Sequence, residues 1–291
     1  MTDYVRPESL EQAFSLLSEP GALPLAGGTD LLGQIDRGIV EPSVLVDISR
    51  LGPEGIRSQG AGLALAAGIT LAEIAASESV TPYGAVASAA AQAASSPLRN
   101  IGTLGGNLCQ GTRCWYFRGQ EWHCWLGGGE TCYAQIGDHR KHNLQAGDCI
   151  SAHPSDLAPA LAACGAEVVV QSAHGSRTIA LAELYRRPTA ENRSLLTLAG
   201  GEIVTDVHLP EPPEASSYQR LGERAAFSFP LVSVAAARRS TAVTVFANGV
   251  ANIPLRIDPD DPLAELPGNP QTMWKRTALK TLVERALADL D

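Results

Sequence analysis

Several features that would define common protein classes are absent from this sequence of 291 residues. Its longest apolar stretches are rich in alanine and fall well short of the roughly 20 residues that cross a bilayer, so we expect no membrane contact. The first residues, MTDY, lack the charged-then-apolar layout of a secretory signal. A cytoplasmic protein is therefore predicted, or one that is exported only as part of a complex carried by a partner.

A basic stripe is missing as well. Lys and Arg number 22 against 31 Asp and Glu, and the formal net charge is -9. Proteins that bind nucleic acid neutralise phosphates with clustered Lys and Arg, so no nucleic-acid partner is expected. Hydrophobic residues make up 45% of the chain and charged residues 18%, as in ordinary globular domains. The length allows two or three lobes.

The CxxC pairs of structural zinc sites are not found either. The chain nevertheless has 6 cysteines, and all but one of them lie between residues 109 and 149. Disulfide frameworks are typical of small secreted domains, which this chain does not resemble. A metal or cluster site is the better interpretation of Cys109, Cys114, Cys124, Cys132 and Cys149, whereas Cys164 lies in a predicted helix as a small core residue.

Hydrophobic periodicity predicts an α+β chain without internal repeats. Helices are expected after Ser9 to residue 17, from Thr70 with Glu73 as its capping partner, and over residues 83–94, 157–164, 230–239 and 272–290. Strands are expected over residues 23–26, 43–48, 63–69, 166–171, 202–209 and 242–247. Residues 211–214 are a natural linker. Residues 111–147 have no sustained period, and bound metal would order such a long loop.

Two glycine motifs follow predicted secondary structure. PLAGGTDL covers residues 24–31, and NIGTLGGN covers residues 100–107 and is expected to form a turn. Paired glycines let the backbone turn tightly and point successive N–H groups at phosphate oxygens. Neither motif is the GxGxxG dinucleotide fingerprint. For either motif alone, a simple tight turn is the more common explanation.

Together with HPSDLAPAL at 153–161 and SFPLVSVAAA at 228–237, these motifs resemble a known family in order and spacing. The chain is similar to the flavin subunit of the molybdenum hydroxylases, meaning the medium subunit of carbon monoxide dehydrogenase and the corresponding domain of xanthine dehydrogenase. The resemblance covers nearly the whole chain. It implies a vanillyl-alcohol-oxidase-type FAD-binding fold of two lobes, residues 1–57 and 58–213, plus a small, shortened C-terminal α+β domain, residues 214–291.

The resemblance also implies where FAD would bind. The pyrophosphate would lie between the first two lobes and contact residues of both glycine motifs and one later aspartate: Leu25, Ala26, Gly27, Gly28, Thr29, Asp30, Leu31, Leu32, Thr103, Gly105, Gly106, Asn107 and Asp156. Asp156 has an alternative role as the cap of the helix that starts at Leu157. The chain departs from the family where a common lysine is replaced by Arg220, and its end after Asn248 is shorter.

The cysteine-rich stretch resembles an insertion in two relatives, the β subunit of 4-hydroxybenzoyl-CoA reductase and the flavin subunit of periplasmic aldehyde oxidoreductases. That resemblance implies a [4Fe–4S] cluster with Cys114, Cys124, Cys132 and Cys149 as ligands. Soft sulfur ligands suit iron–sulfur or zinc, and reduced or disulfide-linked cysteines remain an alternative. His123 and His139 are substitute ligands. Trp115, Trp122 and Trp125 are expected to cover the site and exclude water.

The function implied is that of an FAD-binding electron-transfer subunit, with no catalytic base or nucleophile of its own. Its partners would be a large molybdopterin-binding subunit, a small [2Fe–2S] subunit and an external electron carrier. Two alternatives stay open. One is a self-sufficient FAD-dependent oxidase of the same fold, and the other is a flavin-less scaffold subunit, which flavin content would distinguish.

Overall fold

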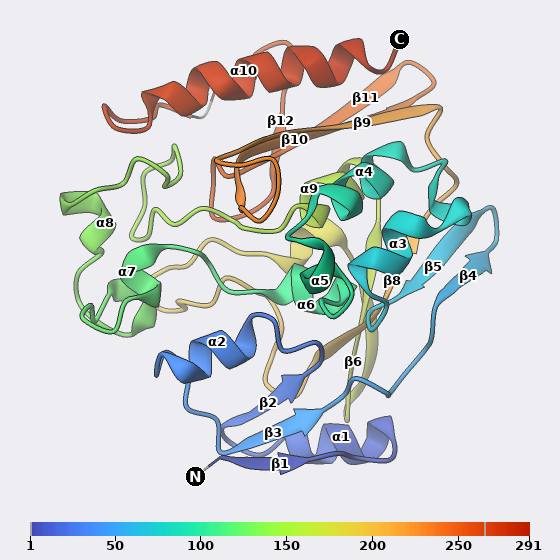
Figure 1. Cartoon of the computed structure of the whole chain (residues 1–291), viewed down its shortest axis with the longest axis vertical. Helices are drawn as coiled ribbons and strands as arrows, with labels where there is room; N and C mark the ends of the chain where they lie inside the picture. The colour runs from blue at the N-terminus through green and yellow to red at the C-terminus, as the bar shows by residue number, and fades with distance from the viewer. Residues whose placement is uncertain (1, 265) are drawn as a thin grey trace.

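The computed structural model describes residues 2–264 and 266–291, so Met1 of the N-terminal segment and Glu265 lie outside the described residues. Its strands form three sheets, and helices cover them (Figure 1). The sheets follow one another along the chain from residues 3–47 through 56–209 to 215–257. The α+β class predicted from periodicity is confirmed.

The first sheet is parallel and has the order β1-β3-β2. Its strands and the two helices beside them are β1 (Asp3–Val5), α1 (Leu10–Leu17), β2 (Ala22–Leu25), α2 (Leu31–Asp36) and β3 (Val44–Asp47). The Ser9 hydroxyl caps α1 by accepting the N–H of Gln12, as expected. The chain leaves β2 through the first glycine motif and enters α2 directly, so this motif lies at the carboxyl end of a strand.

The second sheet has the order β4-β5-β8-β6-β7 with antiparallel neighbours. Its strands are β4 (Ile56–Gln59), β5 (Gly62–Ala66), β6 (Glu167–Ser172), β7 (Gly175–Ala180) and β8 (Ile203–Leu209). The helical elements around it are α3 (Leu71–Ala76), η1 (Glu78–Val80), α4 (Gly84–Gln92), α5 (Ser96–Arg99), α6 (Leu104–Cys109), α9 (Leu157–Ala163) and η3 (Leu181–Leu184). Thr70 and Glu73 form the expected capping box of α3.

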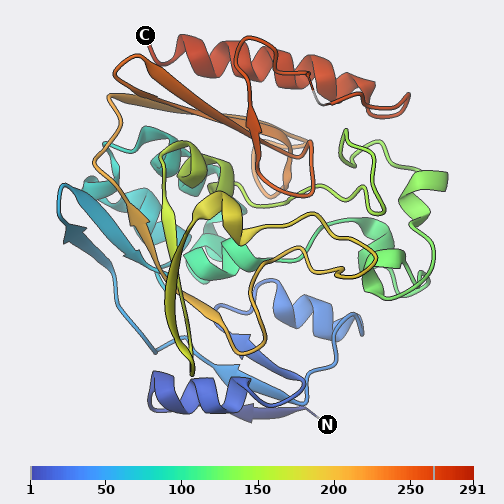
Figure 2. The ribbon, with the colours of Figure 1, turned by 180° about the vertical axis from the view of Figure 1, so that it is seen from behind.

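The third sheet has the order β12-β11-β10-β9, and α10 lies along its outer face (Figures 1 and 2). Its elements are β9 (Ala215–Gly222), β10 (Pro230–Arg239), β11 (Ala242–Asn248), β12 (Leu255–Ile257) and α10 (Met273–Ala288). The helix predicted over residues 230–239 is wrong, because this segment is β10. Val232, Val234 and Ala236 face the core under α10, while Ala235 and Ala237 face the core around α9. A strand buried on both faces has a continuous apolar sequence that periodicity cannot separate from a buried helix.

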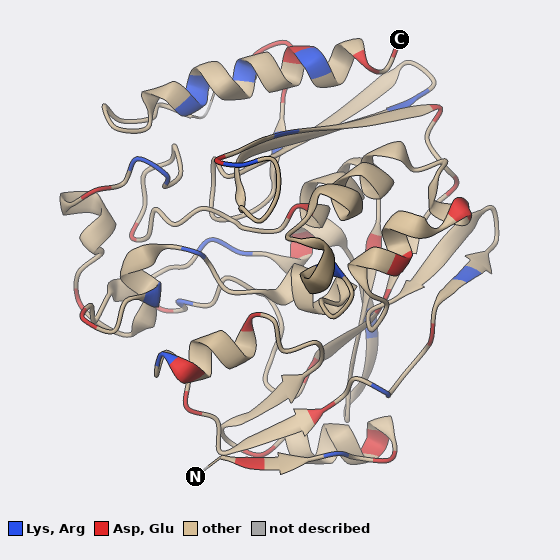
Figure 3. Ribbon diagram, in the orientation of Figure 1, with Lys and Arg blue, Asp and Glu red and all other residues tan. Residues whose placement is uncertain are grey.

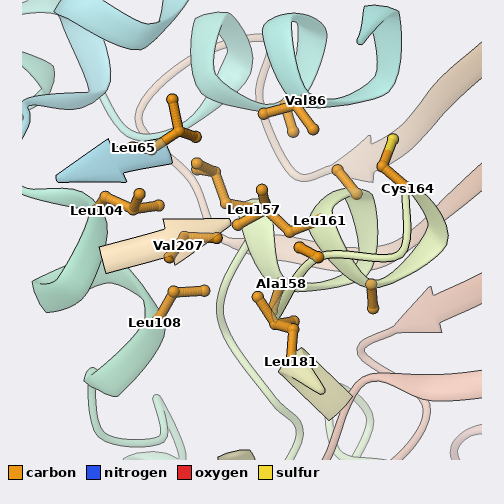
Figure 4. Packing of buried hydrophobic residues seen from close by; sticks show 14 of the residues in the cluster. Leu65, Val86, Leu104, Leu108, Leu157, Ala158, Leu161, Cys164, Leu181 and Val207 are labelled. Atoms are coloured by element: carbon orange, nitrogen blue, oxygen red, sulfur yellow. The ribbon is translucent and has the colours of Figure 1, made fainter. Parts of the chain in front are cut away.

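The main core lies between the second sheet and its helices (Figure 4). Leu65 of β5, Val207 of β8 and Leu104 of α6 meet Leu157 and Leu161 of α9, and all of them are buried. Cys164 is part of this packing and is fully buried, which agrees with its expected core role. Residues 109–149, called the cysteine segment below, start at the last residue of α6, and after it they contain only α7 (Trp115–Arg118), η2 (Trp125–Gly127) and α8 (Tyr133–Ile136) as helical turns. The side chains around these turns form a small cluster separate from the main core.

Candidate functional site: a glycine-lined cleft and a cysteine pocket

A cleft of about 370 Å³ lies between the first and second sheets. Both glycine motifs line it, the first on the turn from β2 to α2 and the second at the start of α6. Sites for small ligands are commonly clefts of about 300–1,000 Å³ with apolar walls and a few placed polar groups. The volume and the lining therefore suit an organic cofactor.

The two glycine motifs touch each other at the floor of the cleft. A Cβ atom on Gly27 would lie 2.1 Å from the carbonyl oxygen of Ile101, so any side chain there would force the motifs apart. Gly28 has a φ of +68°, a conformation that other residues adopt at a cost. The paired glycines are thus required by close approach at Gly27 and by backbone conformation at Gly28.

The second motif is partly helical, which corrects the turn expected over residues 100–107. The Thr103 side chain accepts the N–H of Gly106 at 3.1 Å and so caps α6, which begins at Leu104. The N–H of Gly105 donates to the carbonyl of Ala67 at 2.8 Å, and this bond fixes the motif against the end of β5. A capped helix start beside the cleft gives the motif a defined geometry.

The other walls of the cleft are apolar and were not foreseen from the sequence. They come from the lobe of the first sheet, including α1 and the segment after β3, and from the segment before β8, and they include Leu10, Leu23, Ile48, Leu51, Leu196 and Leu198. Glu202 also lines the cleft, and Arg177 holds its carboxylate through two bonds of 2.8 Å. Aliphatic side chains scattered over distant segments carry no sequence signal for a shared wall.

Most of the residues predicted to bind FAD line this cleft. They are Ala26, Gly27, Gly28, Thr29, Asp30, Leu31, Thr103, Gly105 and Gly106. Leu25, Leu32, Asn107 and Asp156 lie outside its lining. The Asn107 side chain instead accepts a hydrogen bond of 2.6 Å from the Ser155 hydroxyl. Glycine-rich backbone, a hydroxyl and apolar walls together fit the phosphates and rings of a flavin dinucleotide.

Asp156 is a buried structural residue in this fold. Its carboxylate accepts hydrogen bonds from the Tyr218 hydroxyl at 2.6 Å and from Arg220 Nε at 2.8 Å, so it joins α9 to β9. The alternative role as a helix cap is wrong, because its side chain makes no capping bond and the Ser155 hydroxyl accepts the N–H of Ala158 instead. Contact between Asp156 and the cofactor stays a prediction.

The four cysteines predicted as cluster ligands line one small apolar pocket. Cys114, Cys124, Cys132 and Cys149 surround it together with aromatic and aliphatic side chains, among them Tyr116, Phe117, Trp125, Leu126 and Tyr133. Cys109 is not part of the pocket and lines the glycine-lined cleft instead. The fold thus brings together the same four thiols that the resemblance implied, from positions widely separated in sequence.

The environment separates the acidities of these thiols. Burial raises the pKa of Cys114 to about 11. The neighbouring Cys149 thiol, together with backbone N–H groups, lowers the pKa of Cys132. The neighbouring Cys132, together with burial, raises the pKa of Cys149. Of this pair, Cys132 is therefore the more acidic thiol.

A histidine that the sequence did not single out contacts this pocket. His142 Nε2 lies 3.1 Å from Cys114 Sγ, the ring is buried, and it packs edge-on against Trp115 at a centroid distance of 4.7 Å. Burial lowers the pKa of His142 to about 4, so the imidazole is neutral at pH 7. His139, one of the two substitute ligands considered above, bonds to Asn269 at 2.7 Å instead.

Of the tryptophans expected to cover the cysteines, Trp125 lines the pocket and is buried, while Trp122 is 39% exposed, lies outside the pocket lining and packs at a tilted angle against Tyr133. Within residues 2–264 and 266–291, no group of His, Cys, Asp or Glu side chains is arranged to hold a metal ion. The case for a bound cluster therefore comes from the donor set and its apolar surroundings. Four thiols around one apolar pocket match the ligand set of a cubane cluster.

Two basic residues from outside the cysteine segment hold it in place. Arg193 donates to the carbonyls of Trp125 at 2.6 Å and Gly129 at 2.8 Å, and its guanidinium lies over the Trp125 ring. Figure 2 shows the segment before β8, which carries Arg193, reaching across to the cysteine segment. From α10, the buried Lys275 donates to the carbonyl of Lys141 at 2.9 Å. The pocket is thus supported by two different parts of the fold.

The three sheets, the glycine-lined cleft and the cysteine pocket define a cofactor-binding protein. Basic and acidic residues are interleaved along its ribbon (Figure 3). Among the residues that the structure describes, no helix combines the length and apolarity of a bilayer crossing.

Comparison with known proteins gives the family. Residues 1–212 match the FAD binding domain in molybdopterin dehydrogenase. The aldehyde oxidoreductase FAD-binding subunit PaoB of Escherichia coli is 36% identical over 86% of this chain and 81% of its own length. The carbon monoxide dehydrogenase medium chain of Afipia carboxidovorans is 24% identical over 87% of this chain and 76% of its own length. The chain therefore belongs to the family of FAD-binding domains of molybdopterin dehydrogenases, and the resemblance seen in its motifs is confirmed.

Solved structures agree on the fold. Carbon monoxide dehydrogenase from Hydrogenophaga pseudoflava superposes with a TM-score of 0.75 over 99% of this chain and 96% of that chain, at 20% sequence identity. Quinoline 2-oxidoreductase from Pseudomonas putida 86 gives a TM-score of 0.69 over 100% of this chain and 96% of that chain, at 18% identity. At such low identity the match concerns the fold, and it confirms the expected FAD-binding type.

Proposed function

We propose that this chain is the FAD-binding electron-transfer subunit of a heteromeric molybdopterin-dependent dehydrogenase. Membership of the FAD-binding family over residues 1–212 carries the proposal. Relatives named as an FAD-binding subunit, a medium chain and an FAD-subunit support a heteromeric assembly. The proposed partners are a large molybdopterin-binding subunit, a small [2Fe–2S] subunit and an external electron carrier.

FAD would bind across the lobes of residues 1–57 and 58–213, with residues 214–291 as a third domain. The glycine-lined cleft supports this placement, because it lies between the first two sheets and both glycine motifs line it. Backbone around Gly28 and Gly105 would hold the pyrophosphate, and the aliphatic wall would exclude water from the rings. Bound FAD supplies the redox chemistry, while the chain positions it.

A [4Fe–4S] cluster would be held by Cys114, Cys124, Cys132 and Cys149. The shared pocket of these thiols supports the assignment, as does the hydrophobic cluster around them, which includes Tyr116, Ala134 and Ile150. Low solvent exposure and hydrogen bonds to sulfur are the protein's means of setting a cluster's potential. His142 offers such a hydrogen bond to Cys114.

Cofactor analysis of the anaerobically purified chain tests both assignments. We expect one non-covalent FAD and about four irons with matching sulfide per chain, as a single cubane requires. Alanine at any of the four pocket cysteines should abolish iron binding and leave flavin bound. Cys164→Ala is the matched control, because this thiol is buried in the main core, and it should keep both cofactors.

Each alternative outcome has a clear meaning. Zinc in place of iron and sulfide would contradict the cluster. Absence of flavin from folded protein would contradict FAD binding and indicate a scaffold subunit. Oxidation of substrate by the single chain would indicate a self-sufficient oxidase.

A further inference from the structure

The first glycine motif ends in a carboxylate that binds the cysteine segment. Asp30 Oδ2 accepts the N–H of Gly111 at 2.8 Å, and its Oδ1 lies 2.9 Å from a terminal nitrogen of Arg118 and 2.8 Å from one of Arg113. Gln34 of α2 also donates to Asp30 Oδ2, at 2.8 Å. Figures 1 and 2 both place α2 directly beside α7. One side chain of the cleft is therefore bonded to three residues on either side of the pocket cysteine Cys114.

Arg118 extends this contact into the cysteine segment. The residue is only 9% exposed, and its guanidinium donates to the carbonyls of Thr112 at 2.8 Å and Gly111 at 3.0 Å. These hydrogen bonds fix the backbone of the loop between α6 and Cys114. A Cβ atom on Gly111 would lie 3.1 Å from the Arg118 guanidinium and 3.2 Å from the Gln34 amide, so the loop packs closely against α2.

Arg113 links the same carboxylate to the third sheet. Its guanidinium lies 4.2 Å from the centre of the Phe229 ring, which directly precedes β10. Burial lowers the pKa of Arg113 to about 10, and the group is still charged at pH 7. Asp30 thus stands between two cations, and the three side chains together carry one positive charge. An isolated carboxylate would repel a pyrophosphate in the same cleft, and this pairing removes that repulsion.

We infer that Asp30 is a positioning residue that latches the cysteine segment to the glycine-lined cleft, so that cluster retention depends on a residue of the flavin motif. The inference rests on the proposed function. The latch acts through Gly111, Arg113 and Arg118, all of which precede or follow Cys114 within a few positions. The backbone of Asp30 stays available to the cofactor, while its side chain serves the cysteine segment.

Asp30→Asn tests the latch in the full chain. An asparagine keeps the backbone and the size of the side chain but has no charge and only one acceptor oxygen. We expect iron per chain and the cluster's electron paramagnetic resonance signal to fall severalfold, and to fall further than FAD per chain does. Amide hydrogen exchange over residues 111–118 should become roughly tenfold faster, as loss of a hydrogen bond to a charged group predicts.

Two further variants separate a latch from general damage. Asp47→Asn also removes a buried carboxylate from the first sheet, but Asp47 binds Arg6 and Ser49 and not the cysteine segment, so this variant should retain iron. Asp30→Glu keeps the negative charge and should therefore retain more iron than Asp30→Asn. Loss of FAD with full iron in Asp30→Asn would overturn the inference, as would equal iron loss in Asp47→Asn.

The hydrogen-exchange measurement tests the latch even if the chain binds no cluster. If the wild-type chain binds no iron, the cluster assignment fails, yet faster exchange over residues 111–118 in Asp30→Asn still supports the latch. Unchanged exchange there overturns it whatever the iron content.

Discussion

At the scale of single residues, Gly27 is the position where the cleft tolerates least change. Its missing Cβ would lie 2.1 Å from the Ile101 carbonyl oxygen, which is backbone and cannot rotate away. We expect Gly27→Ala to separate the two glycine motifs and to abolish stoichiometric flavin binding, measured by flavin absorbance after gel filtration. The midpoint temperature of thermal unfolding should also fall.

Gly33 provides the matched control for that substitution. It lies in α2, and a Cβ there would meet nothing within 4 Å. Gly33→Ala should keep flavin and stabilise the chain slightly, by about 0.5–1 kcal/mol, because glycine is a poor residue inside a helix. A Gly27→Ala variant that binds flavin as tightly as Gly33→Ala would contradict the close-approach argument.

Some residues of the candidate site could be predicted from the sequence, and others could not. Both glycine motifs and the four pocket cysteines were predicted, because their residue types carry the chemistry directly. Asp30 was assigned to the cofactor, yet its carboxylate faces Arg118 and Gly111, a partnership 88 and 81 positions away in sequence. His142 and Arg193 were missed for the same reason, since only the folded chain brings them to the cysteines.

At the scale of elements, β9 and β10 mark the limit of pattern analysis. The helix predicted for residues 230–239 failed because both faces of β10 are buried, which removes the alternation that identifies a strand. β9 was not predicted at all, since its Ser216, Gln219 and Arg220 look like an exposed segment. Arg220 is nevertheless buried by its pairing with Asp156, a long-range contact that local sequence does not encode.

The element α10 carries a titratable anchor that gives a prediction on pH. Lys275 is fully buried, and its ammonium donates to the carbonyls of Gly249 at 2.7 Å and Lys141 at 2.9 Å. Burial lowers the pKa of Lys275 from 10.5 to about 7. Between these values the unfolded chain binds the proton and the folded chain does not, so the free energy of unfolding rises with pH.

Replacing the lysine by methionine should remove this dependence. Between pH 7 and 10.5, the unfolding free energy of the wild type minus that of Lys275→Met should increase, by at most about 1.4 kcal/mol per pH unit. Urea unfolding at several pH values measures the difference. For Lys280→Met, at an exposed position of the same helix, the free energy of unfolding should vary with pH as it does in the wild type. If the Lys275→Met variant also follows the pH dependence of the wild type, the buried amine keeps its proton.

At the scale of the whole molecule, the cysteine segment contacts all three sheet regions. Asp30 holds it from the first, Arg193 from the segment that leads into β8, and Lys275 from α10 over the third sheet. Because the segment has only short helical turns of its own, these contacts from outside hold it in place. The arrangement of the lobes and the geometry of the cysteine pocket are therefore expected to change together.

The surface of the chain suits assembly with other subunits. Several large apolar side chains are exposed, among them Ile136 at 77%, Phe227 at 60%, Ile101 at 55% and Leu32 at 50%. Stable interfaces bury roughly 1,200–2,000 Å², and a subunit made to pass electrons onward needs such contacts with its neighbours. Affinity purification of the tagged chain from its native cells should therefore recover a molybdopterin-containing subunit and a [2Fe–2S] subunit. The chain expressed alone should show negligible oxidation of aldehydes or N-heterocycles, whereas the recovered complex should turn over. Full turnover by the single chain without molybdenum would overturn the assignment as an electron-transfer subunit.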